Sequence, residues 1–221
     1  STLSPSSAAS DVYKRQQQGA FRQEIVPVSV KGQWVAVDEC PRANTSLEKL
    51  AALPPAFAAG GTVTAGNCCP LNDGASLMLV MSRRKAREYG FTRGLLFADA
   101  CSAGVDPNLL GLGPVPATQK LLARQPALTI GHIAVIEFNE AFAAQVLGSV
   151  DALGIDEQRI NLQGGAIALG HPYGASGAIM VTRLFSQLLA EPDGEGFGLA
   201  MLGIAGAVSY THLTLPTTER V

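Results

Sequence analysis

Charged residues are scarce in this sequence, and long apolar runs are missing. Only 15% of the 221 residues are charged and the formal net charge is -2, which disfavours nucleic acid as a partner. No apolar run approaches the roughly 20 residues of a membrane-spanning helix. The first ten residues contain no charged region followed by an apolar one, so no targeting signal is expected. We predict a protein with neither a nucleic-acid nor a membrane partner.

Cysteine is also rare, and its placement excludes two common uses. The four cysteines at positions 40, 68, 69 and 101 follow no metal-ligand spacing, and the adjacent pair suits a disulfide framework poorly. Nothing in the local sequence would lower a thiol pKa, so we interpret all four as small packing residues. The pattern predicts no metal site and favours a reducing, cytoplasmic location.

Apolar residues and glycine are abundant, and the chain alternates strand-like with helix-like segments. With 47% hydrophobic residues it can bury the core of one large domain or two small ones. The alternation is typical of an α/β protein whose sheet is covered by helices. Strands are predicted at 24–30, 77–81, 95–100, 133–138 and 197–204, and helices at 82–89, 115–124, 140–153 and 174–189.

Both ends differ in composition from the middle of the chain. Residues 1–16 are rich in Ser, Ala and Gln without periodicity, and residues 208–221 interrupt a glycine-rich apolar segment. We interpret both as tails foreign to the fold. Between them, 17–71 is loop-rich, and soft boundaries at Asn72 and Arg93 separate it from the more regular 72–92 and 93–207.

One histidine stands among five glycines just ahead of a predicted helix. Within the stretch 161–177, glycines allow close approach of the backbone to a ligand, and Pro172 restricts the chain directly after His171. Proximity to a helix N-terminus favours the neutral imidazole, which suits a general base. The alternative is that His171 only makes hydrogen bonds within a tight turn.

A second candidate lies where the apolar strand 133–138 ends. Ligands bind at strand ends in α/β proteins, and Asn139 could present its amide to a ligand or water there. Alternatively it could cap the following helix. A third stretch, 61–74, surrounds Cys68 and Cys69 with small and polar residues. A reactive thiol is the alternative there to two packing cysteines, and residues 72–74 are typical of a turn. His132, ahead of the strand, is interpreted as structural.

Taken in order, these stretches resemble the thiolase family, from about Gln17 to Ala207. The matching segments are Gly19–Val28, Gly61–Gly74, Gly113–Thr118, Asn139–Phe142 and Gly164–Gly177. The resemblance implies the layered αβαβα thiolase fold, in a chain corresponding to the C-terminal two-thirds and lacking most of the N-terminal half. It assigns 17–71 to the lid, 72–92 to a remnant of the N-terminal domain and 93–207 to the C-terminal domain.

The same resemblance implies reversible thiolysis of 3-ketoacyl-CoA through an acyl-cysteine, in degradative fatty-acyl or steroid side-chain metabolism. His171 would activate a cysteine expected upstream of Ser1, and Asn139 would hold a water at the oxyanion. Gly203 occupies the position of the family's second catalytic cysteine, and Ala205 replaces a glycine of an oxyanion hole. Cys69 and Leu71 would lie near the pantetheine, and Ala141 and Phe142 would line the acyl pocket.

The resemblance further implies an acyl-CoA substrate, no metal or redox cofactor, and a homodimeric or homotetrameric parent enzyme. We expect this chain to be inactive alone. The main alternative is a non-catalytic thiolase-like module that binds CoA esters or lipid. A chain-elongating ketosynthase is a more distant alternative, because such enzymes use two site histidines, and His132 and His212 stand in unsuitable contexts.

Overall fold

The protein is built around a mixed four-stranded sheet. The computed structural model describes residues 12–190, 196–204 and 206–217. Its main strands are β3 (Gly94–Gly104), β4 (Ile133–Phe138), β5 (Phe197–Ile204) and β6 (Val208–Thr217), in the order β3-β6-β5-β4. β4 and β5 are parallel, whereas β6 is antiparallel to both of its neighbours. Strands β1 (Val28–Val30) and β2 (Gln33–Val35) form a separate hairpin.

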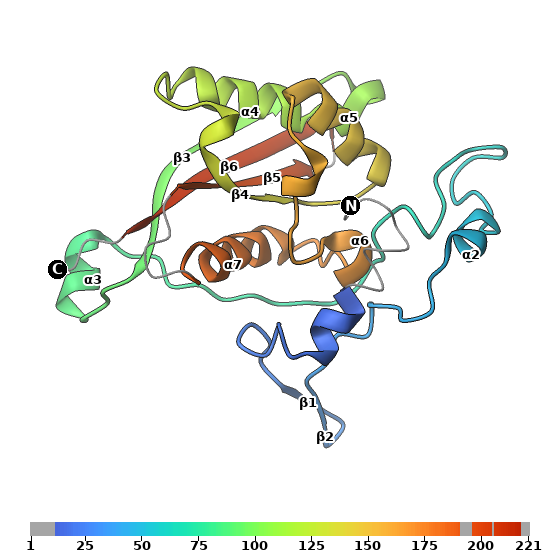
Figure 1. The fold of residues 1–221 in the computed structure, drawn as a ribbon, viewed down its shortest axis with the longest axis horizontal. Coiled ribbons are helices and arrows are strands. Elements are labelled where there is room, and N and C mark those ends of the chain that lie inside the picture. Colours follow the sequence, from blue (N-terminus) through green and yellow to red (C-terminus); the bar gives the residue numbers. More distant parts are fainter. Residues whose placement is uncertain (1–11, 191–195, 205, 218–221) are drawn as a thin grey trace.

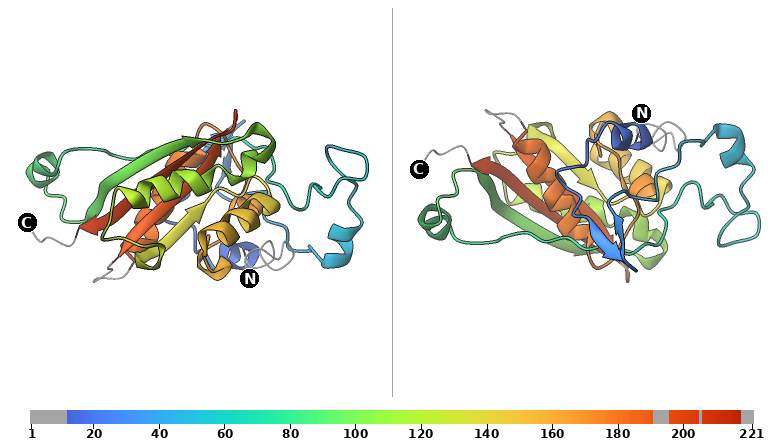
Figure 2. Two further views of the ribbon diagram at one scale, coloured as in Figure 1. Left: turned by 90° about the horizontal axis from the view of Figure 1, so that it is seen from above. Right: turned by 90° about the horizontal axis from the view of Figure 1, so that it is seen from below.

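Helices cover both faces of this sheet, as Figures 1 and 2 show. One face carries α4 (Pro114–Ala123) and α5 (Ala143–Leu153), and the other carries α6 (Ala166–Leu169) and α7 (Ser176–Leu188). The remaining helical elements are α2 (Leu47–Ala51), α3 (Arg83–Glu88) and the short 3-10 turns η1 (Pro107–Leu112), η2 (Ile130–His132) and η3 (Glu157–Arg159). None of the helices in the described ranges has the length and apolarity to cross a bilayer.

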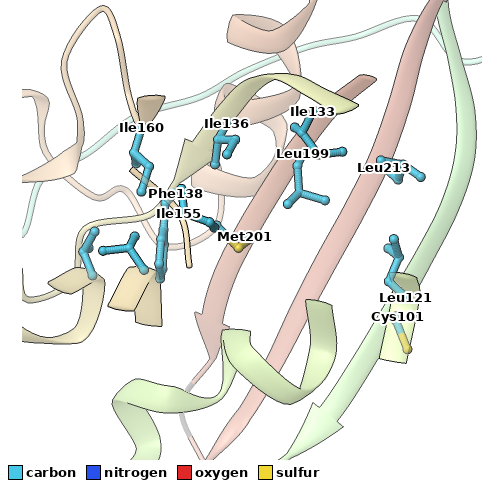
Figure 3. Close-up of a cluster of buried hydrophobic side chains, with 12 residues drawn as sticks. Cys101, Leu121, Ile133, Ile136, Phe138, Ile155, Ile160, Leu199, Met201 and Leu213 are labelled. Carbon is cyan, nitrogen blue, oxygen red and sulfur yellow. The ribbon is translucent and has the colours of Figure 1, made fainter. Parts of the chain in front are cut away.

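The larger hydrophobic core lies between the sheet and the α4–α5 layer (Figure 3). Side chains alternate across a strand, so Leu199 and Met201 enter this core while Ala200 between them faces α7. On the α7 side, Met180 and Leu184 pack in a second cluster. Each fully buried large apolar side chain contributes about 1.5–3 kcal/mol, so these clusters fix the strand ends that carry the site.

Most predicted elements are present, and their ends have local causes. The predicted strands 133–138 and 197–204 are β4 and β5, and the predicted helix 115–124 is α4. Helix α3 begins because the Ser82 hydroxyl accepts from Lys85 N. It is followed by Gly90 with φ +75°, a left-handed position that glycine adopts at low cost.

Three predicted elements differ from the structure. The helix predicted at 140–153 begins only at Ala143, because residues 67–69 pair with 141–143. Only 28–30 of the predicted strand 24–30 is a strand. The predicted strand 77–81 is extended but belongs to no strand ladder of the described residues. It follows the outer side of α7, where Ser76 Oγ lies 3.3 Å from Thr182 Oγ1 (Figure 1).

The chain ends also depart from the expectation that they stand outside the fold. Residues 208–217 form β6, whose residues Ser209, Thr211 and Leu213 are buried. The reason is an alternating pattern with β-branched and aromatic residues, which favours a strand. Residues 12–17 are helical, and the buried Val12 packs with Phe21. The rest of the predicted tails, 1–11 and 218–221, lies outside the described residues.

Candidate functional site

The three stretches singled out in the sequence meet in space at the end of β4. Cys68 forms a β-bridge with Phe142, and Cys69 N donates to Ala141 O at 3.1 Å. The glycine-rich loop joins them because His171 N donates to Pro70 O at 3.3 Å. Segments distant in sequence are therefore held together by backbone hydrogen bonds.

His171 lies at the centre of this meeting point. Its Nε2 is 3.2 Å from Nδ2 of Asn139, and its Nδ1 is 2.6 Å from Oγ of Ser176. The imidazole is 9% exposed and Asn139 is 4% exposed, so both are shielded from most solvent. The ring of Tyr173 packs edge-on against His171, with ring centroids 4.6 Å apart. Both ring nitrogens thus have a partner, and the imidazole has a defined orientation.

Asn139 does not cap the helix that follows it. Phe142 occupies the N-cap position of α5, and Asn139 N donates to Met201 O at 2.9 Å, which extends the pairing of β4 with β5. The side-chain amide is thereby free to point at His171. Of the two roles that the sequence left open for Asn139, helix cap or site residue, the geometry supports the second.

Burial lowers the pKa of His171 from its ordinary value, because desolvation disfavours the imidazolium. We expect its ring resonances to titrate below about 6.5 in the folded chain and near that value in urea, followed by proton NMR. Because the unfolded chain then binds the proton more readily, this group makes folding less favourable as pH falls below about 6.5 toward the folded pKa. A folded pKa at or above the urea value would contradict this.

Two glycines allow the histidine loop to dock tightly. Gly170 has φ +101°, and a Cβ there would overlap the Asn72 side chain. A Cβ at Gly74 would lie 2.6 Å from the Pro172 ring, so segment 72–76 sits directly on the residue after His171. The backbone around the imidazole is therefore closed in by neighbours that leave no space for larger residues.

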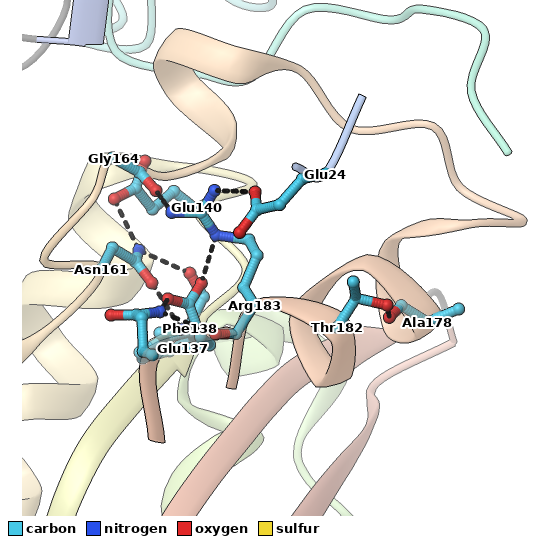
Figure 4. A network of polar contacts seen from close by, with 10 residues as sticks. Glu24, Glu137, Phe138, Glu140, Asn161, Gly164, Ala178, Thr182 and Arg183 are labelled. Carbon is cyan, nitrogen blue, oxygen red and sulfur yellow. Dashed lines mark hydrogen bonds and ion pairs between the residues drawn. The ribbon is translucent and has the colours of Figure 1, made fainter. Parts of the chain in front are cut away.

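A buried polar network supports the loop from beneath (Figure 4). Asn161 Nδ2 donates to Glu140 Oε1 at 2.7 Å and to Phe138 O at 2.8 Å, and its Oδ1 accepts from Phe138 N at 2.7 Å. The other Glu140 oxygen accepts from Ile167 N at 3.0 Å. Burial raises the pKa of Glu140, although these hydrogen bonds oppose the shift. These hydrogen bonds connect the end of β4 to Asn161 and to Ile167, two positions of the segment that leads to His171.

The second half of the network is a buried ion pair. Arg183 of α7 donates through Nε to Glu137 Oε2 at 3.0 Å and through a terminal nitrogen to Gly164 O at 2.9 Å. Gln187 donates to the other Glu137 oxygen at 2.6 Å, and Glu24 approaches Arg183 at 3.8 Å. Burial raises the pKa of Glu137, with the Arg183 charge opposing. Strand, helix and glycine loop are thereby joined.

The remaining predicted site residues are placed less centrally. Cys69 and Ala141 are joined by their backbones, Leu71 is exposed, and Phe142 packs edge-on against Phe57 with centroids 6.0 Å apart. Burial raises the pKa of Cys69 to about 11, which agrees with a packing thiol and disfavours a nucleophile.

Of the two predicted site positions at the end of β5, the structure describes Gly203 but not Ala205. Gly203 is in the strand opposite Ser209, and a Cβ there would lie 2.5 Å from Gln145 Nε2. Any side chain at position 203 would therefore first have to displace Gln145. Ala205, the predicted oxyanion position, lies outside the described residues.

Three residues of the site escaped the sequence predictions: Ser176, Asn161 and Arg183. Only Arg183 carried a usable signal, since it is a lone charge on the face of α7 that otherwise buries Met180 and Leu184. A buried charge of this kind requires a partner. Ser176 and Asn161 resemble ordinary helix-start and turn residues.

Fold and site together define an α/β protein in which a buried histidine on a glycine loop faces an amide at a strand end. The chain belongs to the thiolase family. Residues 95–214 match the model of the thiolase C-terminal domain, and residues 8–84 match that of the thiolase N-terminal domain. The predicted membership is confirmed, and the C-terminal match includes most of β6. The finer domain boundaries stay predictions.

Named relatives agree with this assignment. The chain is 47% identical over 195 residues to the putative acetyl-CoA C-acetyltransferase VraB of Staphylococcus aureus strain MRSA252, covering 88% of the chain and 50% of that protein. It is 49% identical over 200 residues to the protein of the same name from Staphylococcus epidermidis, covering 90% of the chain and 50% of the relative. The chain thus spans about half the length of these relatives.

Solved structures confirm the predicted fold. The acetyl-CoA acetyltransferase of Bacillus anthracis superposes with a TM-score of 0.87 at 35% identity, over 95% of this chain and 53% of that one. Human mitochondrial 3-ketoacyl-CoA thiolase, solved in complex with CoA, superposes with a TM-score of 0.83 at 31% identity. This superposition covers 96% of the present chain and 53% of the human one. The α/β arrangement around the site is therefore that of a thiolase.

Proposed function

We propose that the whole protein is an acyltransferase of the thiolase type that cleaves 3-ketoacyl-CoA with CoA and catalyses the reverse Claisen condensation. The observation that carries this proposal is the convergence of His171 and Asn139, with 3.2 Å between Nε2 and Nδ2. Proteins of similar structure include an acetyl-CoA acetyltransferase and a 3-ketoacyl-CoA thiolase. An acyl-CoA substrate and degradative metabolism are part of the proposal.

The chemistry assigned to the site needs a neutral base and a hydrogen-bond donor. The buried imidazole takes the proton of a cysteine thiol, and the thiolate attacks the ketone carbonyl of 3-ketoacyl-CoA to form an acyl-cysteine. The acetyl-CoA enolate leaves and takes a proton from a second cysteine, which the CoA thiol then reprotonates. The CoA thiolate attacks the acyl-cysteine to form acyl-CoA, and the released cysteine thiolate takes back the proton held by His171. Asn139 holds a water at the oxyanion, and one such donor contributes about 3 kcal/mol. No metal or redox cofactor is part of this scheme.

Neither cysteine of this scheme is assigned to the present chain. The nucleophile is proposed to belong to a part of the protein outside these residues, and Gly203 at the second position has no proton to transfer. We therefore expect the 221-residue chain to give no thiolysis of acetoacetyl-CoA above the buffer rate, measured by loss of thioester absorbance. Turnover that purifies with the chain would contradict this.

Binding of a CoA ester is proposed to use the 67–71 segment beside Ala141 and Phe142. The backbone contact of Cys69 with Ala141 and the exposed Leu71 support this placement. We expect Leu71→Asp to weaken acetoacetyl-CoA binding about tenfold in calorimetry. Leu77→Asp is the matched control, since Leu77 is 92% exposed and lies outside the site. Equal affinities of the two variants would count against the location.

The second candidate function is a non-catalytic module that binds CoA esters or lipid, and Gly203 at the position of a catalytic cysteine favours it. A hybrid enzyme distinguishes this module from the proposed thiolase. Residues 17–202 would replace the matching residues of the 47% identical Staphylococcus aureus relative, and the design requires that the rest of that relative provide the two cysteines of the scheme. We expect thiolysis that falls at least about 100-fold with His171→Ala, the typical contribution of a general base. A folded hybrid that binds CoA without turnover would support the module.

The proposed parent enzyme is a homodimer or homotetramer. Support comes from a similar solved structure, a peroxisomal thiolase of Saccharomyces cerevisiae described as dimeric, with a TM-score of 0.85 at 31% identity over 96% of this chain and 53% of that one.

A further inference from the structure

We propose that Ser176 is a positioning residue that holds His171 in one tautomer, with the proton on Nδ1 and the lone pair of Nε2 facing Asn139. The mechanistic value of this inference rests on the proposed thiolase activity, but the tautomer itself does not. Ser176 is the first residue of α7 and is 4% exposed. Its hydroxyl lies 2.6 Å from Nδ1, so it is a direct partner of the ring.

The single hydroxyl proton determines the direction of this hydrogen bond. Ser176 Oγ also lies 3.0 Å from Pro172 O, in the geometry by which serine in the first turn of a helix donates to the carbonyl four residues earlier. A hydroxyl has one proton and two lone pairs. When its proton goes to Pro172 O, the short contact with the imidazole must be Nδ1–H donating to Oγ.

The other side of the ring supports the same tautomer. Asn139 Nδ2 is a donor and lies 3.2 Å from Nε2, so Nε2 must carry the lone pair to make this hydrogen bond. The reverse tautomer would place two N–H groups against each other in a buried site. Leaving a buried donor unsatisfied costs about 1–3 kcal/mol. The Ser176 and Asn139 contacts are separate observations, and they agree.

This arrangement places the basic atom on the Asn139 side of the ring. A histidine in the other tautomer could not take a proton at Nε2. Both hydrogen bonds that fix the tautomer on this side come from the turn Pro172–Ser176. The Pro172 carbonyl accepts the serine proton, and the Ser176 oxygen accepts Nδ1–H and so orients the ring. The role of Ser176 is therefore to act through His171 and not on a substrate.

The tautomer can be read directly by long-range proton–nitrogen NMR correlation on the nitrogen-labelled chain, above the pH at which His171 titrates and without any substrate. We expect wild type to show Nδ1 protonated and Nε2 unprotonated as one species. Ser176→Ala leaves Nδ1–H without its acceptor while Asn139 still favours a lone pair on Nε2, so it should add a detectable minor population of the reverse tautomer. Ser176→Thr, which keeps a hydroxyl at the same position, should restore the wild-type spectrum.

Either of two results would overturn the inference: a wild-type spectrum with the proton on Nε2, or a Ser176→Ala spectrum that matches wild type. Circular dichroism melting of each variant reports folding, and the wild-type spectrum alone tests the tautomer if Ser176→Ala does not fold. Failure of the hybrid enzyme to turn over would contradict the proposed function and leave the tautomer assignment intact.

Discussion

Arg183→Ala is expected to lower the free energy of unfolding by about 3–5 kcal/mol, because it leaves a buried carboxylate without its counter-charge. Glu137 is 2% exposed and accepts from Arg183 Nε at 3.0 Å. The same substitution also removes the hydrogen bond to Gly164 O in the glycine loop. Urea unfolding followed by circular dichroism measures the change.

A surface ion pair of the same kind is the matched control. Arg84 lies 2.7 Å from Glu88, with the arginine side chain 77% exposed, so Arg84→Ala should cost no more than about 1 kcal/mol. Replacing both buried partners, as in Arg183→Met with Glu137→Leu, should recover much of the loss, since the fully buried carboxylate is removed together with its counter-charge and only the less buried Glu24 loses its 3.8 Å contact. An Arg183→Ala variant as stable as Arg84→Ala would refute the role given to the buried pair.

The second large effect is expected for Gly165→Ala. The backbone at Gly165 is extended, with φ -121°, so strain is not the cause. An added Cβ would overlap the Glu140 carboxylate, which Asn161 Nδ2 and Ile167 N hold in place. Moving a buried carboxylate away from these donors and overpacking the site should together cost about 3–5 kcal/mol, again measured by urea unfolding.

Gly177→Ala is the control for this substitution. A Cβ at Gly177 meets nothing within 4 Å, and the residue lies in helix α7. Alanine has the better helix propensity, so this variant should be unchanged or more stable by up to about 1 kcal/mol. If the two alanine variants had equal stability, Glu140 would have to be free to move.

The sequence predicted those elements whose determinants are local. Strand 133–138 is a short apolar run and the helix at 115–124 follows a proline-rich start, and both appear almost as expected. Segment 77–81 has the composition of a strand, but its state depends on a neighbouring strand that the described residues do not provide. The start of α5 shifts for a similar reason, because backbone pairing with 67–69 replaces its first turn.

The site residues likewise fall into those with a local sequence signal, which were predicted, and those without one. His171 and Asn139 were predicted because each stands in a dense local motif of glycines or at a strand end. The partners that orient and support them were not, because Asn161 reaches Glu140 across 21 residues and Arg183 reaches Glu137 across 46. Such pairings depend on how strand and helix pack, and a short sequence window contains no information about it.

The place of β6 in the sheet has a consequence for how the chain folds during synthesis. Among the described strands, β3 pairs only with β6, in a register that runs from Gly94 opposite Thr217 to Gly104 opposite Val208. During translation β3 is synthesised about a hundred residues before β6, so β3 has no partner strand while β4 and β5 are being made. Pairing of β3 with β6 closes a loop of about a hundred residues, which costs entropy and is slow, so the sheet is completed late in folding. Until then the unpaired β3 is a site that chaperones can bind.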